Sequence, residues 1–409
     1  MKSVKILHTS DWHLGKKLFK LSRLPEQKIF IEYFLKTIQS EDINLVIIAG
    51  DIFDTPQPPH EAISLFFSTL KRLSDLGVTT VIIAGNHDSA VFIDSPSPLL
   101  KELNVHVCGQ LINSEHQLDL GKLTLDLEIH QSKIHLSLLP YFRNWEMEVL
   151  AQQEQLQLEN EEDYLKLIEL LFKKLTSSEA DTNILVAHHL FGPFQISGSE
   201  QGISLGTLAS IPLKMTSQYF NYAALGHIHK RQSFEVEKSS IVYCGSPLPF
   251  RFSESNEKSM ELITIDKEGV RHEKHALPMI RKLVKLELQS DKWNKQWLSH
   301  LENFENACQL NPYYEVHLHL VKPEAGLHDI IRQAIHDSGA EVLSFFTLLP
   351  ETENGSIDHL QVINQLQNTE KLFETFYQNK YPGTELPLDL KSELHLLLDE
   401  VRKNEIQDL

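Results

Sequence analysis

Six short apolar runs rich in β-branched residues recur within residues 1–275, and this recurrence limits the fold more than any other feature. They are KILHTS (5–10), NLVIIAG (44–50), TTVIIAG (79–85), NILVAH (183–188), NYAALGH (221–227) and SSIVYCG (239–245). Over 26–40 and 60–77, between the first three runs, apolar residues recur every three or four positions, which is typical of helices. Strands that alternate with helices predict a layered α/β domain.

The segment LTLDLEIHQSKIHLSLLP (123–140) departs from this alternation because it reads as a β-hairpin. We therefore expect mixed rather than purely parallel pairing, which two sheets packed as a sandwich would accommodate. Residues 145–175 are rich in Glu, Gln and Leu, and this composition predicts one or two exposed helices with a solvated face.

A second pattern follows residue 280. Strand-like runs over 281–288, 313–320 and 340–349 alternate with helical patterns over 292–304 and 326–339, which predicts a small α+β domain in 280–350.

A polar, Gly-containing stretch begins at residue 351 and predicts a linker over 351–366. The remaining residues, 367–409, hold two short amphipathic helical patterns, 368–381 and 388–403, separated by Pro382-Gly383. Such helices either dock on a partner or pack as a hairpin on their own chain, and the pattern favours neither.

Composition limits the cellular compartment and the kinds of partner that we expect for the chain. No apolar run approaches the roughly 18 residues of a membrane span, and the N-terminus does not resemble a signal peptide. Three scattered cysteines among 409 residues indicate a reducing cytoplasm rather than a disulfide framework. The net charge of -18 argues against strong autonomous binding of nucleic acid. It leaves room for a local basic patch or for a partner chain that supplies positive charge. Basic residues that could contact phosphates are Lys16, Lys17, Lys20 and Arg23 after the first motif, and Arg251, Arg271, Arg281, Lys282 and Lys285 around the start of the second pattern.

Asp, Asn or His side chains follow five of the apolar runs, at the point where each strand is expected to end. They are Asp11 and His13, Asp51 and Asp54, Asn86 with His87 and Asp88, His188 with His189, and His227 with His229. Because sites in α/β sheets form outside the carboxyl ends of the strands, we expect these side chains to converge. A lone histidine at a strand end is usually structural, but five such ends in succession indicate one site.

The spacing within the first motif suggests shared use of one ion. In an extended chain, side chains at positions i and i+2 point the same way, so Asp11 and His13 are expected to reach one ion together, with Trp12 turned into the packing. The same reasoning applies to His227 and His229.

The candidate ligands number seven, which is too many for one tetrahedral site and suits two ions that share a carboxylate. They are Asp11, His13, Asp51, Asn86, His188, His227 and His229. Nitrogen and oxygen ligands without a thiolate favour Mn, Fe or Zn. After NILVAH, either His188 or His189 is available as the ligand, and His188 is preferred because it directly closes the apolar run.

The order D-x-H, G-D-x-x-D, G-N-H-D, H, G-H-x-H resembles the pattern of the calcineurin-like metallophosphoesterase superfamily. Four longer segments resemble the double-strand-break repair nucleases, the family that includes the nuclease subunits of bacterial SbcCD complexes: SDWHLGK (10–16), AGDIFDTPQPP (49–59), AGNHDS (84–89) and YCGSPLPFRFSE (243–254). The resemblance implies a two-sheet β-sandwich flanked by helices over 1–275 and a small α+β cap, which binds DNA, over 280–350. It also implies a C-terminal helical hairpin (367–409) that docks on a coiled-coil ATPase.

The resemblance further implies roles for single residues. One ion would be held by Asp11, His13, Asp51 and His229, and the other by Asp51, Asn86, His188 and His227. His87 would lie near the scissile phosphate, where it would stabilise developing charge and protonate the leaving oxygen. Asp54 or Asp88 would orient the ring of His87, as carboxylates behind an active site commonly do.

The activity implied by the resemblance is Mn²⁺-dependent hydrolysis of DNA phosphodiesters. It would comprise a 3′–5′ double-strand exonuclease and a single-strand or hairpin endonuclease, serving DNA repair, replication and recombination. The implied partners are DNA and an SbcC-type coiled-coil ATPase, with a homodimer of this chain inside a heterotetramer in the cytoplasm, at the nucleoid. The alternative is another calcineurin-like phosphodiesterase acting on small phosphoesters, which the metal motifs alone do not exclude. A non-catalytic scaffold is disfavoured because all seven ligands and His87 are present.

Overall fold

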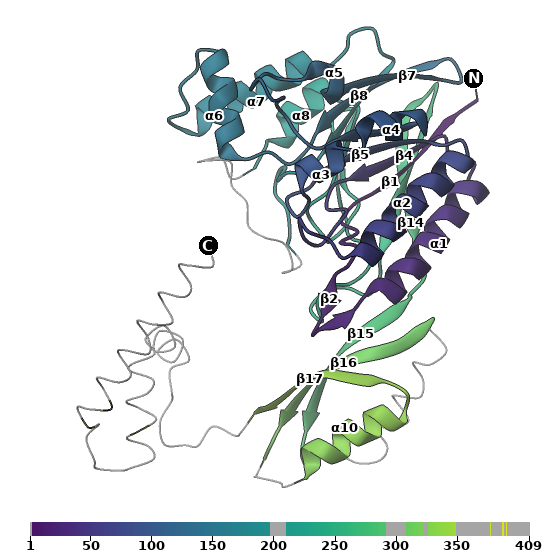
Figure 1. Ribbon diagram of the computed structural model, residues 1–409, viewed down its shortest axis with the longest axis vertical. Helices are drawn as coiled ribbons and strands as arrows, with labels where there is room; N and C mark the ends of the chain where they lie inside the picture. The colour runs from purple at the N-terminus through teal and green to yellow at the C-terminus, as the bar shows by residue number, and fades with distance from the viewer. Residues whose placement is uncertain are drawn as a thin grey trace. The chain divides into compact units, whose positions relative to one another are not determined.

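The computed structural model describes residues 2–196, 210–291, 308–321 and 326–348, together with Tyr377, Pro387 and Leu390 (Figure 1). The chain divides into two compact units, Met1–Leu348 and Leu349–Leu409, and every element named below belongs to the first. The helix expected over 292–304 and the linker over 351–366 lie outside the described residues. So do the C-terminal helices, except for the three single residues. No helix in the described part of the chain is long and apolar enough to cross a membrane.

A six-stranded mixed sheet contains the first three predicted strands. Its strands, in order across the sheet, are β14 (Gly269–Ala276), β13 (Ser259–Asp266), β1 (Val4–Thr9), β4 (Leu45–Ala49), β5 (Thr79–Ile83) and β6 (Val105–Cys108). The last four run parallel, whereas β13 pairs antiparallel with β1 and with β14. The carboxyl ends of β1, β4 and β5 therefore share one edge of the sheet.

A second six-stranded sheet contains the other predicted strands. Its order is β11 (Gln232–Val236), β12 (Ser239–Tyr243), β10 (Tyr222–Leu225), β9 (Thr182–Ala187), β8 (Ser132–Leu139) and β7 (Thr124–Ile129). β8, β9, β10 and β12 run parallel. β7 and β8 pair antiparallel across a tight turn, which confirms the predicted hairpin.

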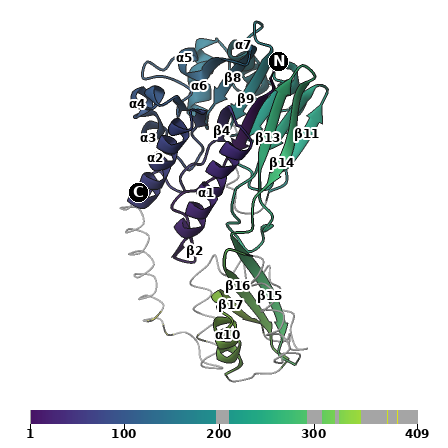
Figure 2. The same ribbon diagram turned by 90° about the vertical axis from the view of Figure 1, so that its right-hand side faces the viewer.

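The two sheets pack face to face around one hydrophobic core. In β4, Leu45 and Ile47 belong to this core, whereas Val46 and Ile48 belong to a second core under the helices. The strand is continuously apolar because it is buried on both faces. α1 (Leu24–Ser40) and α2 (His60–Asp75) lie side by side and contribute apolar residues to that second core (Figure 2). The predicted sandwich flanked by helices is confirmed.

The Glu- and Gln-rich segment forms α6 (Asn144–Gln153) and α7 (Glu161–Leu175). The prediction of helices with a solvated face is confirmed, but the composition gave no sign that the other face is buried. Tyr164, Leu167, Leu171 and Phe172 of α7 are buried in the main core. These residues recur at three- and four-residue spacing, so the helix buries one stripe while its charges face solvent.

Short elements complete the sandwich. They are the hairpin β2 (Lys17–Leu18) and β3 (Leu21–Ser22) and the helices α3 (Ala90–Asp94), α4 (Ser97–Glu102), α5 (Leu120–Leu123) and α8 (Leu213–Tyr219).

The residues after β14 form a three-stranded parallel sheet of β15 (Arg281–Gln289), β16 (Leu310–His319) and β17 (Glu341–Leu348), with α10 (Leu327–Asp337) between the last two. This small sheet has a hydrophobic core of its own, which includes Val316 and Ile331. It contacts the sandwich where Leu283 and Tyr313 pack with Leu18.

Candidate metal centre

Five strand ends, drawn from both sheets, supply the predicted ligands. In the first sheet, β1, β4 and β5 end just before Asp11, Asp51 and Asn86. In the second sheet, β9 and β10 end just before His188 and His227. Side chains from the two sheets mix within each cluster described below, so the centre lies where the two sheets meet.

Glycines at the strand ends let the backbones approach closely at this point. Gly50 has a φ of +86°, and a Cβ added there would lie 2.2 Å from Nδ1 of His188. A Cβ added at Gly85 would lie 2.2 Å from Oδ1 of Asp51. Any side chain at either position would displace a predicted ligand, which explains why glycine occupies both.

The backbone that carries the ligands is not extended, contrary to the expectation from i, i+2 spacing. Asp11 and His13 have φ values of 53° and 45°, and Asp51 and His227 have values of 50° and 86°. This left-handed conformation is uncommon for residues with a side chain and costs on the order of 1–3 kcal/mol each. Trp12, between the first two, is nevertheless fully buried, as predicted. The turn, rather than strand alternation, brings the two ligands to one side.

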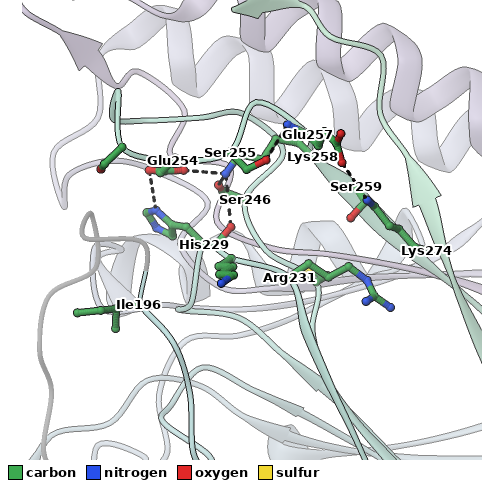
Figure 3. A pocket seen from close by; sticks show the side chains of 13 residues that line it. Ile196, His229, Arg231, Ser246, Glu254, Ser255, Glu257, Lys258, Ser259 and Lys274 are labelled. Carbon is green, nitrogen blue, oxygen red and sulfur yellow. Dashed lines mark hydrogen bonds and ion pairs between the residues drawn. The ribbon is translucent and has the colours of Figure 1, made fainter. Parts of the chain in front are cut away.

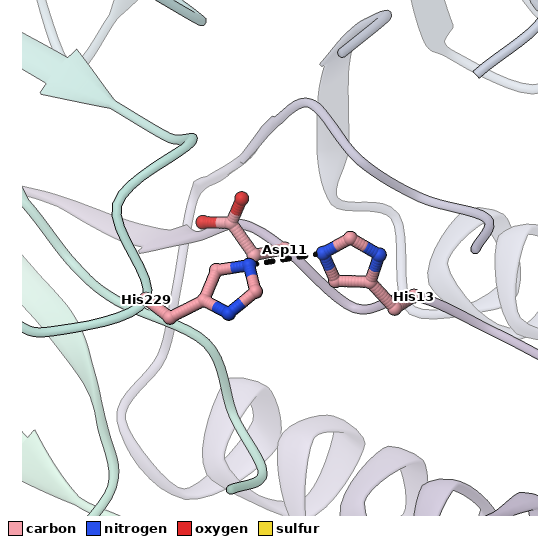
Figure 4. Close-up of side chains that lie close together, drawn as sticks. All are labelled: Asp11, His13 and His229. Carbon is pink, nitrogen blue, oxygen red and sulfur yellow. Dashed lines mark hydrogen bonds between the residues drawn. The ribbon is translucent and has the colours of Figure 1, made fainter. Parts of the chain in front are cut away.

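Asp11, His13 and His229 form the first cluster, with one ligand atom from each lying within 4.8 Å of the others (Figure 4). The Nε2 atoms of His13 and His229 face each other at 3.1 Å. The carboxylate of Asp11 is held in place because the backbone N–H of His227 donates to it at 2.9 Å. The hydroxyl of Ser10 also donates to it.

Asp51, His188 and His227 form the second cluster. His188 can donate from Nδ1 to the backbone carbonyl of Ala49 at 2.8 Å, which leaves its Nε2 3.4 Å from Oδ2 of Asp51. The amide oxygen of Asn86 lies 3.2 Å from that Nε2 and 3.0 Å from Nδ1 of His227. Asn86 therefore joins this cluster.

Asp51 lies between the two clusters. Its Oδ2 is 3.6 Å from Nε2 of His13 and 3.4 Å from Nε2 of His188. Its Oδ1 accepts a hydrogen bond from the backbone N–H of His87 at 2.9 Å. A carboxylate in this position can bridge two cations, and its role as the shared ligand stays a prediction.

His189 lies apart from both clusters. Its ring stacks on Tyr141 at a centroid distance of 5.2 Å, and its Nε2 accepts a hydrogen bond from the backbone N–H of Phe142 at 3.1 Å. Of the two histidines that the sequence offered, the structure brings His188 into the second cluster and uses His189 in packing.

The contacts that orient His87 differ from the expectation of a carboxylate partner. Nδ1 of His87 lies 2.9 Å from the backbone carbonyl of Asp54, to which it can donate. The Asp54 carboxylate instead lies 2.6 Å from Nζ of Lys16 and 3.3 Å from Nδ1 of His13. Asp88 accepts hydrogen bonds from three backbone N–H groups, those of Ile52, Phe53 and Gly85. Asp54 thus steadies His13 of the first cluster, and Asp88 steadies the loops that carry Asp51 and Asn86.

The electrostatics of the centre suit cations. Burial alone would lower the pKa of His188, but the neighbouring carboxylate of Asp51 outweighs it and raises the pKa to about 9. Burial, together with the charge of His188, lowers the pKa of His227 to about 4. Nε2 of His227 is buried and has no hydrogen-bond partner among the described residues. A buried polar atom without a partner is costly unless something binds it. Nitrogen and oxygen donors that converge without a thiolate fit divalent ions.

Two cavities beside the centre have aromatic side chains in their lining. The first has a volume of about 390 Å³, and its lining includes Asn86 as well as Tyr141, Arg143 and Trp145. Trp145 is 48% exposed. The second has a volume of about 460 Å³. Its lining contains the cationic Lys16, Lys17 and Arg251, the aromatic Phe19, Phe250 and Phe252, and the acidic Glu315.

Sequence reasoning missed two residues behind the centre, Glu254 and Lys258. Both line a third cavity, of about 480 Å³, together with His229. Glu254 is the last residue of the segment YCGSPLPFRFSE. Its place in that segment was the feature of the sequence that could have identified Glu254 as a functional residue.

The chain is similar to a known protein family and to individual known proteins. The model of the calcineurin-like phosphoesterase family matches residues 4–231. The D subunit of the nuclease SbcCD from Staphylococcus epidermidis (strain ATCC 12228 / FDA PCI 1200) is 30% identical over 274 residues, covering 66% of this chain and 68% of that protein. The corresponding SbcCD protein of Bacillus subtilis (strain 168) is 31% identical over 274 residues, covering 65% and 67%. Among solved structures, a dimetal phosphatase from Danio rerio aligns with a TM-score of 0.42 and 11% identity, covering 67% of this chain and 98% of that one.

Proposed function

This chain belongs to the calcineurin-like phosphoesterase family, and from that premise we propose that it is the Mn²⁺-dependent nuclease subunit of an SbcCD-type complex. Its family and its two SbcCD relatives support a hydrolase of phosphodiester bonds that acts as a nuclease subunit. We further assign it a 3′–5′ exonuclease activity on duplex ends and an endonuclease activity on single strands and hairpins. These activities would serve DNA repair, recombination and replication.

Two clusters of side chains would hold the two ions. Asp11, His13, Asp51 and His229 are assigned to one, and Asp51, Asn86, His188 and His227 to the other. When bound, two divalent ions supply positive charge that polarises the phosphodiester and activates the attacking water. The short contacts of Asp11 and Asp51 with backbone N–H groups support this assignment, because they fix both carboxylates before an ion binds.

His87 is assigned to the leaving oxygen. Its Nδ1 can donate to the carbonyl of Asp54, so the ring is fixed with Nε2 as the remaining polar atom. The ring lies 4.8 Å from that of His13, centroid to centroid, and is half-buried. When both ring nitrogens carry a proton, a histidine so held can give the one on Nε2 to the oxygen that leaves as the bond breaks.

The two cavities beside the centre support a nucleic acid, rather than a small ester, as the substrate. A small phosphoester needs only the metal ligands, whereas a DNA strand also offers flanking phosphates and base faces. Lys16, Lys17 and Arg251 suit the phosphates, and the exposed ring of Trp145 suits a base, because stacking on an aromatic side chain is worth about 1–3 kcal/mol per base.

The experiment compares three substrates: a single-stranded DNA circle, an end-labelled duplex and a small chromogenic phosphodiester. Each is incubated with the purified chain and Mn²⁺, then again with the SbcC-type ATPase and ATP. Cutting of the circle, with duplex cutting dependent on the ATPase, supports the proposal. Turnover of the small ester alone would contradict it and favour a small-molecule phosphodiesterase.

A variant sharpens the same experiment. Trp145→Ala should raise the KM for the single strand about 5- to 150-fold, the loss of one stacked base, and leave the KM for the small ester unchanged. Leu99→Ala is the matched control, because Leu99 is 68% exposed on α4. Equal losses on both substrates would mean that Trp145 supports the centre rather than the strand.

The assembly is part of the proposal. We assign residues 1–275 to the nuclease domain, 280–350 to a cap that binds DNA, 351–366 to a linker and 367–409 to helices that dock on the ATPase. A net charge of -18 fits a subunit that relies on its partner, and on a second copy of itself, to retain DNA at the nucleoid.

A further inference from the structure

The two ring nitrogens of His229 face different surroundings. Nε2 points to the centre, 3.1 Å from Nε2 of His13. Nδ1 points the other way, toward the carboxylate of Glu254, with 3.8 Å between Nδ1 and Oε1 (Figure 3). A histidine can bind a metal through one nitrogen only when the proton sits on the other, so whatever faces Nδ1 matters for binding through Nε2.

Glu254 is buried and held in a single position. Its side chain is 0% exposed, and Oε2 lies 2.7 Å from Nζ of Lys258, whose side chain is 9% exposed. A buried carboxylate persists only when a partner offsets the loss of water. Lys258 provides that partner and leaves Oε1 directed at His229.

Lys258 also holds the backbone of the same histidine. Its Nζ donates to the carbonyl of His229 at 3.4 Å and to the hydroxyl of Ser246 at 2.9 Å. The backbone N–H of Ser246 donates to that carbonyl as well, at 3.1 Å. One lysine therefore ties the backbone of His229 to the carboxylate that faces its ring, and Figure 3 shows these contacts together.

We propose that Glu254, anchored by Lys258, is a positioning residue that keeps the proton of His229 on Nδ1 and thereby presents the Nε2 lone pair to the metal centre. The negative charge behind the ring also makes Nε2 a stronger donor to a cation. This inference rests on the proposed metal site, but it does not depend on DNA being the substrate.

The test measures Mn²⁺ affinity of the full chain by isothermal titration calorimetry, with Glu254→Gln compared with the unsubstituted chain. The substitution keeps the shape and removes the charge. Loss of a carboxylate behind a ligating histidine typically weakens metal binding about 10- to 100-fold, and this loss is expected for one of the two ions. Cleavage activity should recover when Mn²⁺ is raised in proportion.

Glu257→Gln is the matched control. Glu257 lines the same cavity, but its side chain is 80% exposed and lies 3.9 Å from Lys274. It should leave Mn²⁺ affinity unchanged. Two results would overturn the proposal: wild-type affinity for both ions in Glu254→Gln, or equal weakening in the control. If the unsubstituted chain binds Mn²⁺ but cuts no DNA, the proposed function fails, while the comparison of affinities still decides the present inference.

A second measurement uses the chain with Glu254 unchanged. It therefore tests the proposal even if Glu254→Gln does not fold. Nitrogen-15 spectra of the metal-free chain, labelled at histidine, distinguish the two tautomers, and the His229 signals are assigned as those missing from His229→Gln. The expected result is a proton on Nδ1 and a lone pair on Nε2. The opposite tautomer would refute the role of Glu254.

Discussion

Asp51 is the residue on which most of the centre depends, because one carboxylate faces histidines of both clusters. Asp51→Asn should lower cleavage by more than about 100-fold, since even residues behind the ligands contribute about 10- to 100-fold. Mn²⁺ content, measured by elemental analysis, should fall from two ions toward none. If Asp51→Asn kept both its normal Mn²⁺ content and its activity, the assignment of Asp51 as the bridging ligand would be wrong.

His87→Gln is the informative comparison for that variant. It should keep both ions and slow cleavage by about 100- to 10,000-fold, the usual range for a lost proton donor. Loss of metal in this variant would instead make His87 a ligand.

His8 in β1 makes stability depend on pH. It is fully buried, and burial lowers its pKa from 6.5 to about 4. Between pH 6.5 and 4 the unfolded chain binds a proton there that the folded chain does not, so the free energy of unfolding falls as the pH falls through this range. The loss reaches about 3 kcal/mol near the lower end.

Urea unfolding at pH 7 and pH 4.5, with a chelator present, measures this effect. His8→Gln cannot take up the proton, so its stability should fall less than that of the unsubstituted chain. Identical falls in the two proteins would show that His8 does not contribute.

At this scale, the sequence was sufficient to identify which residue types converge, because strands that end at one edge of a sheet bring their next residues together. It could not supply the left-handed turns at Asp11 and His13, because spacing alone suggested an extended chain. Nor could it pair Glu254 with His229, since no periodicity links a loop residue to a ligand 25 positions earlier.

At the scale of elements, α7 shows how composition can mislead. Its many charges suggested an exposed helix, yet Phe172 is fully buried in the main core. Phe172→Ala should lower the free energy of unfolding by about 3–5 kcal/mol, while metal affinity changes little because the helix supplies no ligand.

The neighbouring Lys173 provides the control for this prediction. Its side chain is 55% exposed, so Lys173→Ala should change stability by less than about 0.5 kcal/mol. Chemical denaturation of both variants settles the point: equal effects would mean that α7 does not pack as described.

The strands that sequence reasoning missed lie mainly at sheet edges. β11 and β14 are edge strands, and β14 has the sequence GVRHEKHA, which carries charge where a central strand would be apolar. Edge strands commonly carry such charges to avoid pairing with other chains. Most central strands were predictable because burial on both faces leaves a continuous apolar run. β13, which lies between β14 and β1, was missed because polar residues interrupt its sequence, SMELITID.

At the scale of the whole molecule, the chain consists of two compact units that divide after Leu348. A chain truncated after residue 365 should bind Mn²⁺ as the full chain does, because all proposed ligands precede that point. It should no longer bind the SbcC-type ATPase, as measured by co-purification of the two proteins. Undiminished association would refute the docking role of 367–409.

The order of events during synthesis follows from the placement of the centre between two sheets. His13 and His229 face each other across 216 positions of sequence, so a growing chain carries Asp11 and Asp51 long before their partners exist. Contacts between such distant positions form late and slowly, because a long loop must close first. Under the proposed function, the ability to cut DNA would therefore arise only after the second sheet has closed on the first, and a chain still incomplete on the ribosome would be inert.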